Sequence, residues 1–288
     1  MGKITLIKLV GKVREMPPLP QSITQILEIT KDDSSSSREL ADVFEKDPTL
    51  AVNILKLANL PSYGFSSRIS TISHAIVCLG LETIKSIALT SSTHEMLNKE
   101  IPAYSLGEGM LWQHSILCAT CAKIIAQRIG YKDNEEAYIA GLLLDIGKII
   151  LSGFAEDEFK QISEIAEKDK VPFNIAEQQV LGFDHPQVGG RVIKKWNLPS
   201  ALVEAVLYHH QPDKAEAHKT LAYIVHLADA ISCMLGIGLG SDGLMYAFEE
   251  HTLDVLGLSN EDVESIMSEL VDKVGEEDDE DEVEQFSS

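Results

Sequence analysis

The chain has 288 residues, 44% of them hydrophobic and 24% charged, and its 45 acidic and 24 basic side chains give a net charge of −21. This composition excludes a collagen-like or wholly disordered chain. Binding to DNA and to anionic membranes depends on cationic side chains, so the charge argues against a nucleic-acid partner and against a membrane surface. Four cysteines do not make a disulfide framework in a chain of this length. Together with the lack of a long apolar segment, these features lead us to expect a cytoplasmic protein.

The predicted elements of the first part are helices, over residues 36–45, 48–58, 73–79 and 82–97. Ser36 and Glu39 form a capping-box pattern at the start of the first helix. Asp47-Pro48 supplies the N-cap and the first turn of the second, and Gly80 closes the third. The loop after the fourth helix predicts a domain boundary, so we expect a first lobe at 1–104.

The second part is also predicted to be helical, over residues 111–128, 134–144, 156–168, 172–181, 185–196, 199–210, 220–234 and 260–274, with more helix directly after residues 145–148. Gly130 ends the first of these helices. We find no segment with the alternating pattern of a strand, so the predicted fold is all-α, with a second lobe at 105–274. Eight acidic residues fall within 276–284, and such a block predicts a disordered acidic tail at 275–288.

Side chains of the kind that bind metals recur in the second part: His114, Asp145, His185, His209, His210 and Asp229. Imidazoles and carboxylates together suit divalent Fe, Mn or Zn. Asp145 follows three leucines and Asp229 lies within an apolar run, and a buried carboxylate needs a partner. A shared metal centre explains these residues. A structural hydrogen-bond network explains them as well, and the residues alone leave both interpretations open.

The segment from Leu144 to Lys148 resembles the HD-x-G-K signature of HD-domain phosphohydrolases, especially the HD-GYP branch. The six metal-type residues also follow the order of that branch's ligands. The resemblance implies that His114 is the first ligand and Asp229 the last, and that Asp145 and Lys148 are catalytic, with the lysine near the substrate phosphate. Leu144 stands where the branch has the histidine of its HD pair, so one ligand is missing. No Gly-Tyr-Pro motif follows the histidine pair.

Further motifs lie in the first part: Met16-Pro17-Pro18-Leu19-Pro20, Asp47-Pro48-Thr49-Leu50, Leu55-Lys56-Leu57-Ala58-Asn59, Tyr63-Gly64 and Leu79-Gly80. As a set they resemble the HDOD family, the HD-related output domain of bacterial signalling proteins, over residues of about 12 to 235. The resemblance implies a two-lobed helical fold with an HD-like C-terminal lobe. It also implies a regulatory output role more often than a catalytic one.

The sequence is therefore compatible with two functions. The favoured one is a signalling output protein whose degenerate HD-type site acts by binding a partner protein, a nucleotide or another phosphorylated small molecule. The alternative is a metal-dependent phosphohydrolase or phosphodiesterase, in which a divalent cation lowers the pKa of a bound water. The missing ligand at Leu144 favours the first, and the retained polar positions favour the second.

Two other motifs have simpler interpretations. Cys118 and Cys121 share a helix face with His114, and a zinc site is conceivable, but no second cysteine pair exists and we expect core residues. The glycine-rich segment 236–243 lacks the preceding strand and the Lys-Ser/Thr of a phosphate-binding loop, so we expect a flexible connector.

Overall fold

The computed structural model describes residues 6–30, 37–59, 65, 68–153, 156–240 and 250–285. Within these ranges the regular elements are helices, with one isolated bridge between Ile101 and Leu106, which confirms the all-α prediction. The chain divides into two compact units. One comprises Met1–Pro18 with Glu95–Met267, and the other Leu19–His94 with Ser268–Ser288.

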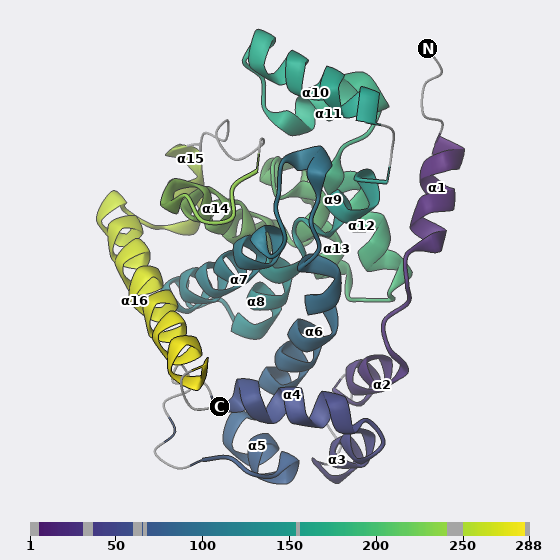
Figure 1. Cartoon of the computed structure of the whole chain (residues 1–288). Helices are drawn as coiled ribbons and strands as arrows, with labels where there is room; N and C mark the ends of the chain where they lie inside the picture. Colours follow the sequence, from purple (N-terminus) through teal and green to yellow (C-terminus); the bar gives the residue numbers. More distant parts are fainter. Residues whose placement is uncertain are drawn as a thin grey trace. The chain divides into compact units, whose positions relative to one another are not determined.

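The smaller unit contains α2 (Gln21–Ile29), α3 (Ser37–Glu45), α4 (Pro48–Ala58), α5 (Ile72–Leu79) and most of α6 (Leu81–Leu97) (Figure 1). The predicted N-cap at Asp47 is confirmed, since its carboxylate accepts from the Leu50 N–H at 3.1 Å and from the Ser22 hydroxyl at 2.8 Å. Gly80 ends α5 with φ +82°, as predicted. The capping-box residue Ser36 and the motif Tyr63-Gly64 lie outside the described residues.

The larger unit holds α1 (Leu6–Glu15), α7 (Met110–Ile129), α8 (Asn134–Leu143), α9 (Ile146–Leu151), α10 (Glu156–Asp169), α11 (Phe173–Leu181), α12 (His185–Lys195), α13 (Ser200–Tyr208), α14 (Lys219–Leu235), α15 (Glu250–Leu256) and the start of α16 (Asn260–Gln285). Short 3₁₀ turns cover Pro102–Tyr104 and Pro212–Lys214. Helix α7 packs against α8 and α14, and α12 packs against α9 and α13. Figure 1 shows α7, α8 and α14 near the middle of this unit.

The boundary between the units differs from the predicted one at 104/105. Tyr104 belongs with the larger unit, because its ring is buried against Phe159 and Phe173, at centroid distances of 5.1 and 5.4 Å. Residues 1–18 also belong there. Lys195 Nζ donates to the carbonyl oxygens of Val13, Arg14 and Met16, at 3.0, 2.9 and 2.6 Å, which fixes the end of α1 to α12.

Helices α1, α2 and α15 have no counterpart among the predicted elements. The acidic segment expected as a disordered tail lies in α16 as far as Gln285, and glutamate favours helices. Residues 286–288 lie outside the described part. Among the described residues, no single helix has both the length and the apolar character to cross a membrane. Helices α5 and α6, bent by 119° relative to each other, pass that test only as a pair, by length and composition.

One glycine permits the contact that assembles the site described below. A Cβ atom on Gly147 in α9 would lie 2.0 Å from the carbonyl oxygen of His185, at the start of α12. A real side chain cannot approach a carbonyl so closely, so α9 and α12 can pack in this way only with glycine at this position. The glycine of the HD-x-G-K-like segment thus brings Asp145 and His185 together.

Candidate functional site

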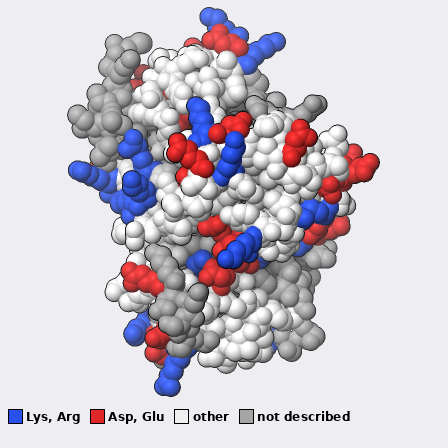
Figure 2. Space-filling view, turned by 180° about the vertical axis from the view of Figure 1, so that it is seen from behind, with Lys and Arg blue, Asp and Glu red and all other residues white. Residues whose placement is uncertain are grey.

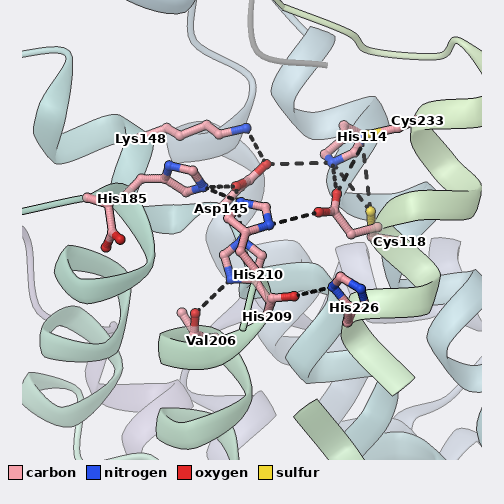
Figure 3. Close-up of polar contacts among 12 residues, drawn as sticks. His114, Cys118, Asp145, Lys148, His185, Val206, His209, His210, His226 and Cys233 are labelled. Carbon is pink, nitrogen blue, oxygen red and sulfur yellow. Dashed lines mark hydrogen bonds and ion pairs between the residues drawn. The ribbon is translucent and has the colours of Figure 1, made fainter. Parts of the chain in front are cut away.

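The residues predicted as metal ligands or catalytic groups converge on one buried polar centre in the larger unit (Figure 3). They lie on four helices or in the segments directly beside helix ends. His114 lies on α7, Asp145 in the break between α8 and α9, Lys148 on α9, His185 at the first position of α12, His209 and His210 after α13, and Asp229 on α14. The sequence order of these residues therefore corresponds to a real cluster in space.

Asp145 lies within 4 Å of four other side chains of this centre. Its Oδ2 lies 2.6 Å from Lys148 Nζ and 3.6 Å from His114 Nε2. Its Oδ1 lies 3.4 Å from His185 Nε2 and 3.9 Å from His209 Nε2. Burial alone raises the pKa of Asp145, but the Lys148 ammonium, followed by His185 and His114, outweighs burial and holds the pKa well below its ordinary value. The carboxylate is therefore ionised in the centre of the cluster.

Asp229 forms the second acidic position. Its Oδ1 lies 3.2 Å from His114 Nε2 and its Oδ2 3.6 Å from His210 Nδ1. Burial raises the pKa of Asp229, but its contact with His114 lowers that pKa by more. Burial favours the neutral form of His114, whereas Cys118 and Asp229 act in the opposite direction and raise its pKa well above the ordinary value.

His185 is oriented by a residue that the sequence analysis did not identify. Glu177 on α11 is completely buried, and its Oε2 accepts from the backbone N–H of His185 at 2.7 Å and lies 2.9 Å from His185 Nδ1. The Tyr104 hydroxyl donates to the other oxygen, Oε1, at 2.6 Å. Glu177 thus fixes the ring with Nε2 facing the centre, 3.0 Å from His210 Nε2, as carboxylates orient metal-binding histidines. Burial lowers the pKa of His185, but Glu177 and Asp145 together raise it above its ordinary value. In the sequence, this role of Glu177 is indicated by its carboxylate, which lies among the apolar residues of 173–181.

His209 presents its Nε2 in the same way. Its Nδ1 donates to the Val206 carbonyl at 2.7 Å, and the carbonyl of His209 accepts from His226 Nδ1 at 2.7 Å. Burial, reinforced by His185, lowers the pKa of His209 to about 4, so the ring is neutral near pH 7. Burial and the neighbouring histidines also lower the pKa of His210 well below its ordinary value.

Two buried acceptors in this centre lack hydrogen-bond partners within the described part of the chain. They are His209 Nε2 and Asp145 Oδ1. Buried acceptors without a donor are costly, and a bound ion or water is the usual compensation. The side chains of His185, His209 and His210 could also hold one ion by the spacing of their nitrogen atoms. The residues present therefore fit a divalent cation, as the HD-type resemblance implies.

The cavity next to these groups is very small. It measures about 10 Å³, close to the least space that holds one water. Its lining comprises Leu106, Leu111, His114, Asp145, Lys148, His210, Asp229, Cys233, Gly238, Leu239 and Gly240. The segment 236–240, predicted as a flexible connector, thus borders the site. A Cβ on Gly238 would lie 2.5 Å from the Met110 carbonyl oxygen and 2.8 Å from His114 N, so this glycine permits close packing onto α7. Gly243 lies outside the described residues.

Cysteine side chains also reach the centre. Cys118 Sγ lies 3.4 Å from His114 Nε2, and Cys233 Sγ lies 3.8 Å from Asp229 Oδ1. Cys118 and Cys121 are both completely buried, as expected for core residues. Burial raises the pKa of the Cys118 thiol to about 12. The expectation for Cys118 was nevertheless incomplete, because this core residue also touches a candidate ligand.

Known proteins share parts of this sequence. The HDOD domain family matches residues 16–212. An uncharacterized protein of Treponema pallidum (strain Nichols) is 21% identical over 220 residues, which are 76% of this chain and 42% of that protein. Ribonuclease Y of Thermus thermophilus is 31% identical over 128 residues, which are 44% of this chain and 17% of that protein. The chain thus spans less than half the length of these curated relatives.

Solved structures share the fold over nearly the whole chain. The crystal structure of an HDOD domain protein of unknown function from Geobacter sulfurreducens has a TM-score of 0.75 at 26% identity, covering 94% of this chain and 96% of that chain. A provisionally named phosphohydrolase from Shewanella amazonensis SB2B has a TM-score of 0.72 at 23% identity, covering 93% and 94%. A provisionally named signal transduction protein from Marinobacter aquaeolei VT8 has a TM-score of 0.73 at 24% identity, covering 96% and 60%. These likenesses confirm the HDOD fold, and since the domain match extends over more than half of its residues, the chain belongs to the HDOD family.

Proposed function

We propose that this protein is a regulatory output protein whose HD-type centre is used for binding and not for phosphate hydrolysis. The observation that carries the proposal is the size of the cavity at the centre, about 10 Å³. A phosphate ester is far larger than the single water that such a space accommodates. Leu106, Leu111 and the segment 238–240 line this space beside His114 and Asp145, and in this arrangement it is too small for a substrate phosphate.

The charges around Asp145 support the same conclusion. A cation that catalyses hydrolysis would need this carboxylate as a ligand, yet Lys148 Nζ lies 2.6 Å from Oδ2 in a buried ion pair. Removing one partner of a buried ion pair strongly destabilises the folded protein, because the other charge stays buried without compensation. Leu144, which is buried, replaces the histidine that would supply a further ligand. A cation that binds here therefore has fewer ligands than in an HD-type enzyme.

A protein is the partner that the surface favours. On the face drawn in Figure 2, acidic and basic side chains are interspersed among uncharged ones, and the basic side chains occur in small groups. A duplex nucleic acid requires a concentrated basic surface, and the net charge of the chain is −21. The absence of nucleic-acid binding stays a prediction, as does the partner protein. A nucleotide is a less favoured ligand, because it would have to displace the segment 238–240.

Hydrolysis assays of the full chain test the proposal. The protein, purified without tags or chelators under low oxygen, is loaded with Fe²⁺, Mn²⁺ or Zn²⁺ and incubated with p-nitrophenyl phosphate and bis(p-nitrophenyl) phosphate. We expect the rate of wild type to equal that of Asp145→Ala. Turnover that Asp145→Ala removes would contradict the regulatory proposal.

One observation favours the alternative, a metal-dependent phosphohydrolase. The buried acceptors His209 Nε2 and Asp145 Oδ1 are 3.9 Å apart and fit the ligand shell of a cation. A divalent cation there would supply a nucleophilic hydroxide by lowering the pKa of a bound water. In that case Asp145, Asp229 and the histidines would hold the cation, and Lys148 would contact the phosphate in place of Asp145. Retained activity in Lys148→Met would argue against that role of the lysine.

A further inference from the structure

The loop of residues 101–106, shortly before α7, is a compact turn closed by its own hydrogen bonds. Ile101 and Leu106 exchange two backbone hydrogen bonds, of 2.8 and 3.2 Å. Between them lie the 3₁₀ turn Pro102–Tyr104 and Ser105, which is left-handed with φ +56°. A residue other than glycine keeps this conformation only where the surrounding structure fixes it. Ile101, Tyr104 and Leu106 are buried, so the loop holds these side chains in set positions.

Tyr104 connects this loop to His185 through one carboxylate. Its hydroxyl donates to Glu177 Oε1 at 2.6 Å, while Glu177 Oε2 accepts from the His185 N–H at 2.7 Å and lies 2.9 Å from His185 Nδ1. The Tyr104 and His185 rings also meet edge to face, with their centroids 6.4 Å apart. All three side chains are completely buried, so bulk water does not replace a hydrogen bond that is lost here. The hydroxyl therefore holds the carboxylate that holds the imidazole.

The loop reaches the HD-type centre at a second place. Leu106 lines the small cavity together with Asp145 and Lys148. Lys148 Nζ, which pairs with Asp145, also lies 5.6 Å from the centre of the Tyr104 ring. In Figure 3 the two side chains that Tyr104 meets, Lys148 and His185, lie together on one side of the centre. One short loop thus contacts a candidate ligand, the lysine of the HD-type segment and the cavity.

We propose that the loop 101–106 sets the HD-type centre in two ways. Tyr104 is a positioning residue that holds His185 through Glu177, and Leu106 keeps anions away from a cation bound in the centre. Groups that hold a metal-binding histidine matter nearly as much as the ligands themselves, and losing one usually lowers metal affinity about ten- to a hundredfold. The role of Tyr104 is independent of the proposed regulatory function, because binding and hydrolysis both need His185 in place. The role of Leu106 rests on that function, which requires that phosphates stay out.

The histidine ring signals of the metal-free full chain test the role of Tyr104. Tyr104→Phe keeps the packed ring and removes only the hydroxyl. We expect the nuclear magnetic resonance signals of the His185 imidazole, assigned with His185→Gln, to shift or broaden in this variant. We also expect its Mn²⁺ affinity to fall at least tenfold. Tyr131→Phe is the matched control, because the Tyr131 hydroxyl donates to Glu136 at 2.9 Å, away from the centre. It should keep the wild-type signals and the wild-type affinity.

Inorganic phosphate tests the role of Leu106. A phosphate that reaches a bound Mn²⁺ ion has its phosphorus resonance broadened by the unpaired electrons of the metal. We expect the Mn²⁺-loaded wild type, dialysed to remove free metal, to leave the resonance sharp. Leu106→Ala frees space in the cavity and should broaden it. Leu117→Ala is the control, because Leu117 is buried on α7 but does not line the cavity, and it should behave as wild type.

Unchanged His185 signals in Tyr104→Phe would overturn the positioning role. Broadening of phosphate by wild type, or a wild type that binds no Mn²⁺, would overturn the role of Leu106. Circular dichroism verifies each fold, and Glu177→Gln and Leu106→Val replace the first variants if these do not fold. The hydrolysis assay decides the regulatory proposal and the His185 signals decide the positioning role, so the failure of one is distinguishable from the failure of the other.

Discussion

His209 Nε2 and Asp145 Oδ1 lie 3.9 Å apart in the buried centre of the larger unit, and neither has a hydrogen-bond partner among the described residues. His209 Nδ1–H donates a hydrogen bond to the Val206 carbonyl, which leaves Nε2 as an acceptor that faces another acceptor. A cation between them would satisfy both. A cation or a proton that binds between these two acceptors changes the free energy of the folded state. The stability of the folded chain should therefore depend on metal and on pH.

A cation should raise the stability of the folded chain. A ligand that binds only the folded state adds about 2.7 kcal/mol to the free energy of unfolding at a concentration one hundred times its Kd. We expect the melting temperature of metal-free protein to rise with added Zn²⁺ or Mn²⁺ and to fall again with a chelator. His209→Leu should lose most of the Mn²⁺ effect, because that response depends on the histidine cluster. Equal shifts in wild type and His209→Leu would rule out a cation at His209.

Acid should destabilise the metal-free protein through His209. Its pKa is about 4 in the folded chain and about 6.5 in an unfolded one, so the unfolded state binds more protons between these values. Stability is therefore fully present above pH 6.5 and falls as the pH drops towards 4, by at most about 3 kcal/mol for this group. Denaturant titrations between pH 4.5 and 7 measure the slope. His209→Gln should flatten it, and an identical slope in wild type and variant would refute the assignment.

Gly147 should be indispensable for the packing of α9 on α12. Gly147→Ala places a Cβ 2.0 Å from the His185 carbonyl oxygen, so the helices must separate or the chain must strain. We expect a loss of stability of about 3 kcal/mol or more, as for severe overpacking. Gly11→Ala on α1 is the control, because its Cβ meets nothing within 4 Å and alanine favours helices. Chemical denaturation measures both, and a Gly147→Ala variant as stable as wild type would contradict the packing.

Lys195 should hold the N-terminal helix in place. Its ammonium donates to three carbonyl oxygens at the end of α1, and the Trp196 indole N–H donates to the Pro17 carbonyl at 3.0 Å. Lys195→Met leaves these acceptors without the charged donor, at a cost of about 1 to 3 kcal/mol. We expect faster limited proteolysis within residues 6–18, and the neighbouring exposed Lys194→Met as control should be cleaved at the wild-type rate. Equal cleavage of both variants would show that Lys195 does not hold the segment.

The parts that could be predicted from the sequence are those with local causes. Asp47 and Pro48 start α4, and Gly130 ends α7 with φ +69°, because caps depend on neighbouring residues. The candidate ligands could be found for a similar reason. Asp145 and Asp229 are carboxylates in apolar stretches, and the order of all six metal-type residues matches a known signature.

The features that escaped prediction depend on contacts between distant parts of the chain. Glu177 receives a hydrogen bond from Tyr104, 73 residues away, and nothing near either residue indicates that pairing. Gly238 carries no ligand of its own and matters because its backbone lies against Met110 and His114 of α7. The N-terminal helix was missed because Lys195, far along the sequence, supplies its anchor.

The most direct test of the central claim is the hydrolysis rate of bis(p-nitrophenyl) phosphate per chain at saturating Mn²⁺, measured side by side for wild type and Asp145→Ala. The claim that the HD-type centre binds without turnover predicts the same background rate for both proteins. A wild-type rate well above that of Asp145→Ala, in proteins of equal metal content and fold, would contradict it and establish the centre as a phosphodiesterase site.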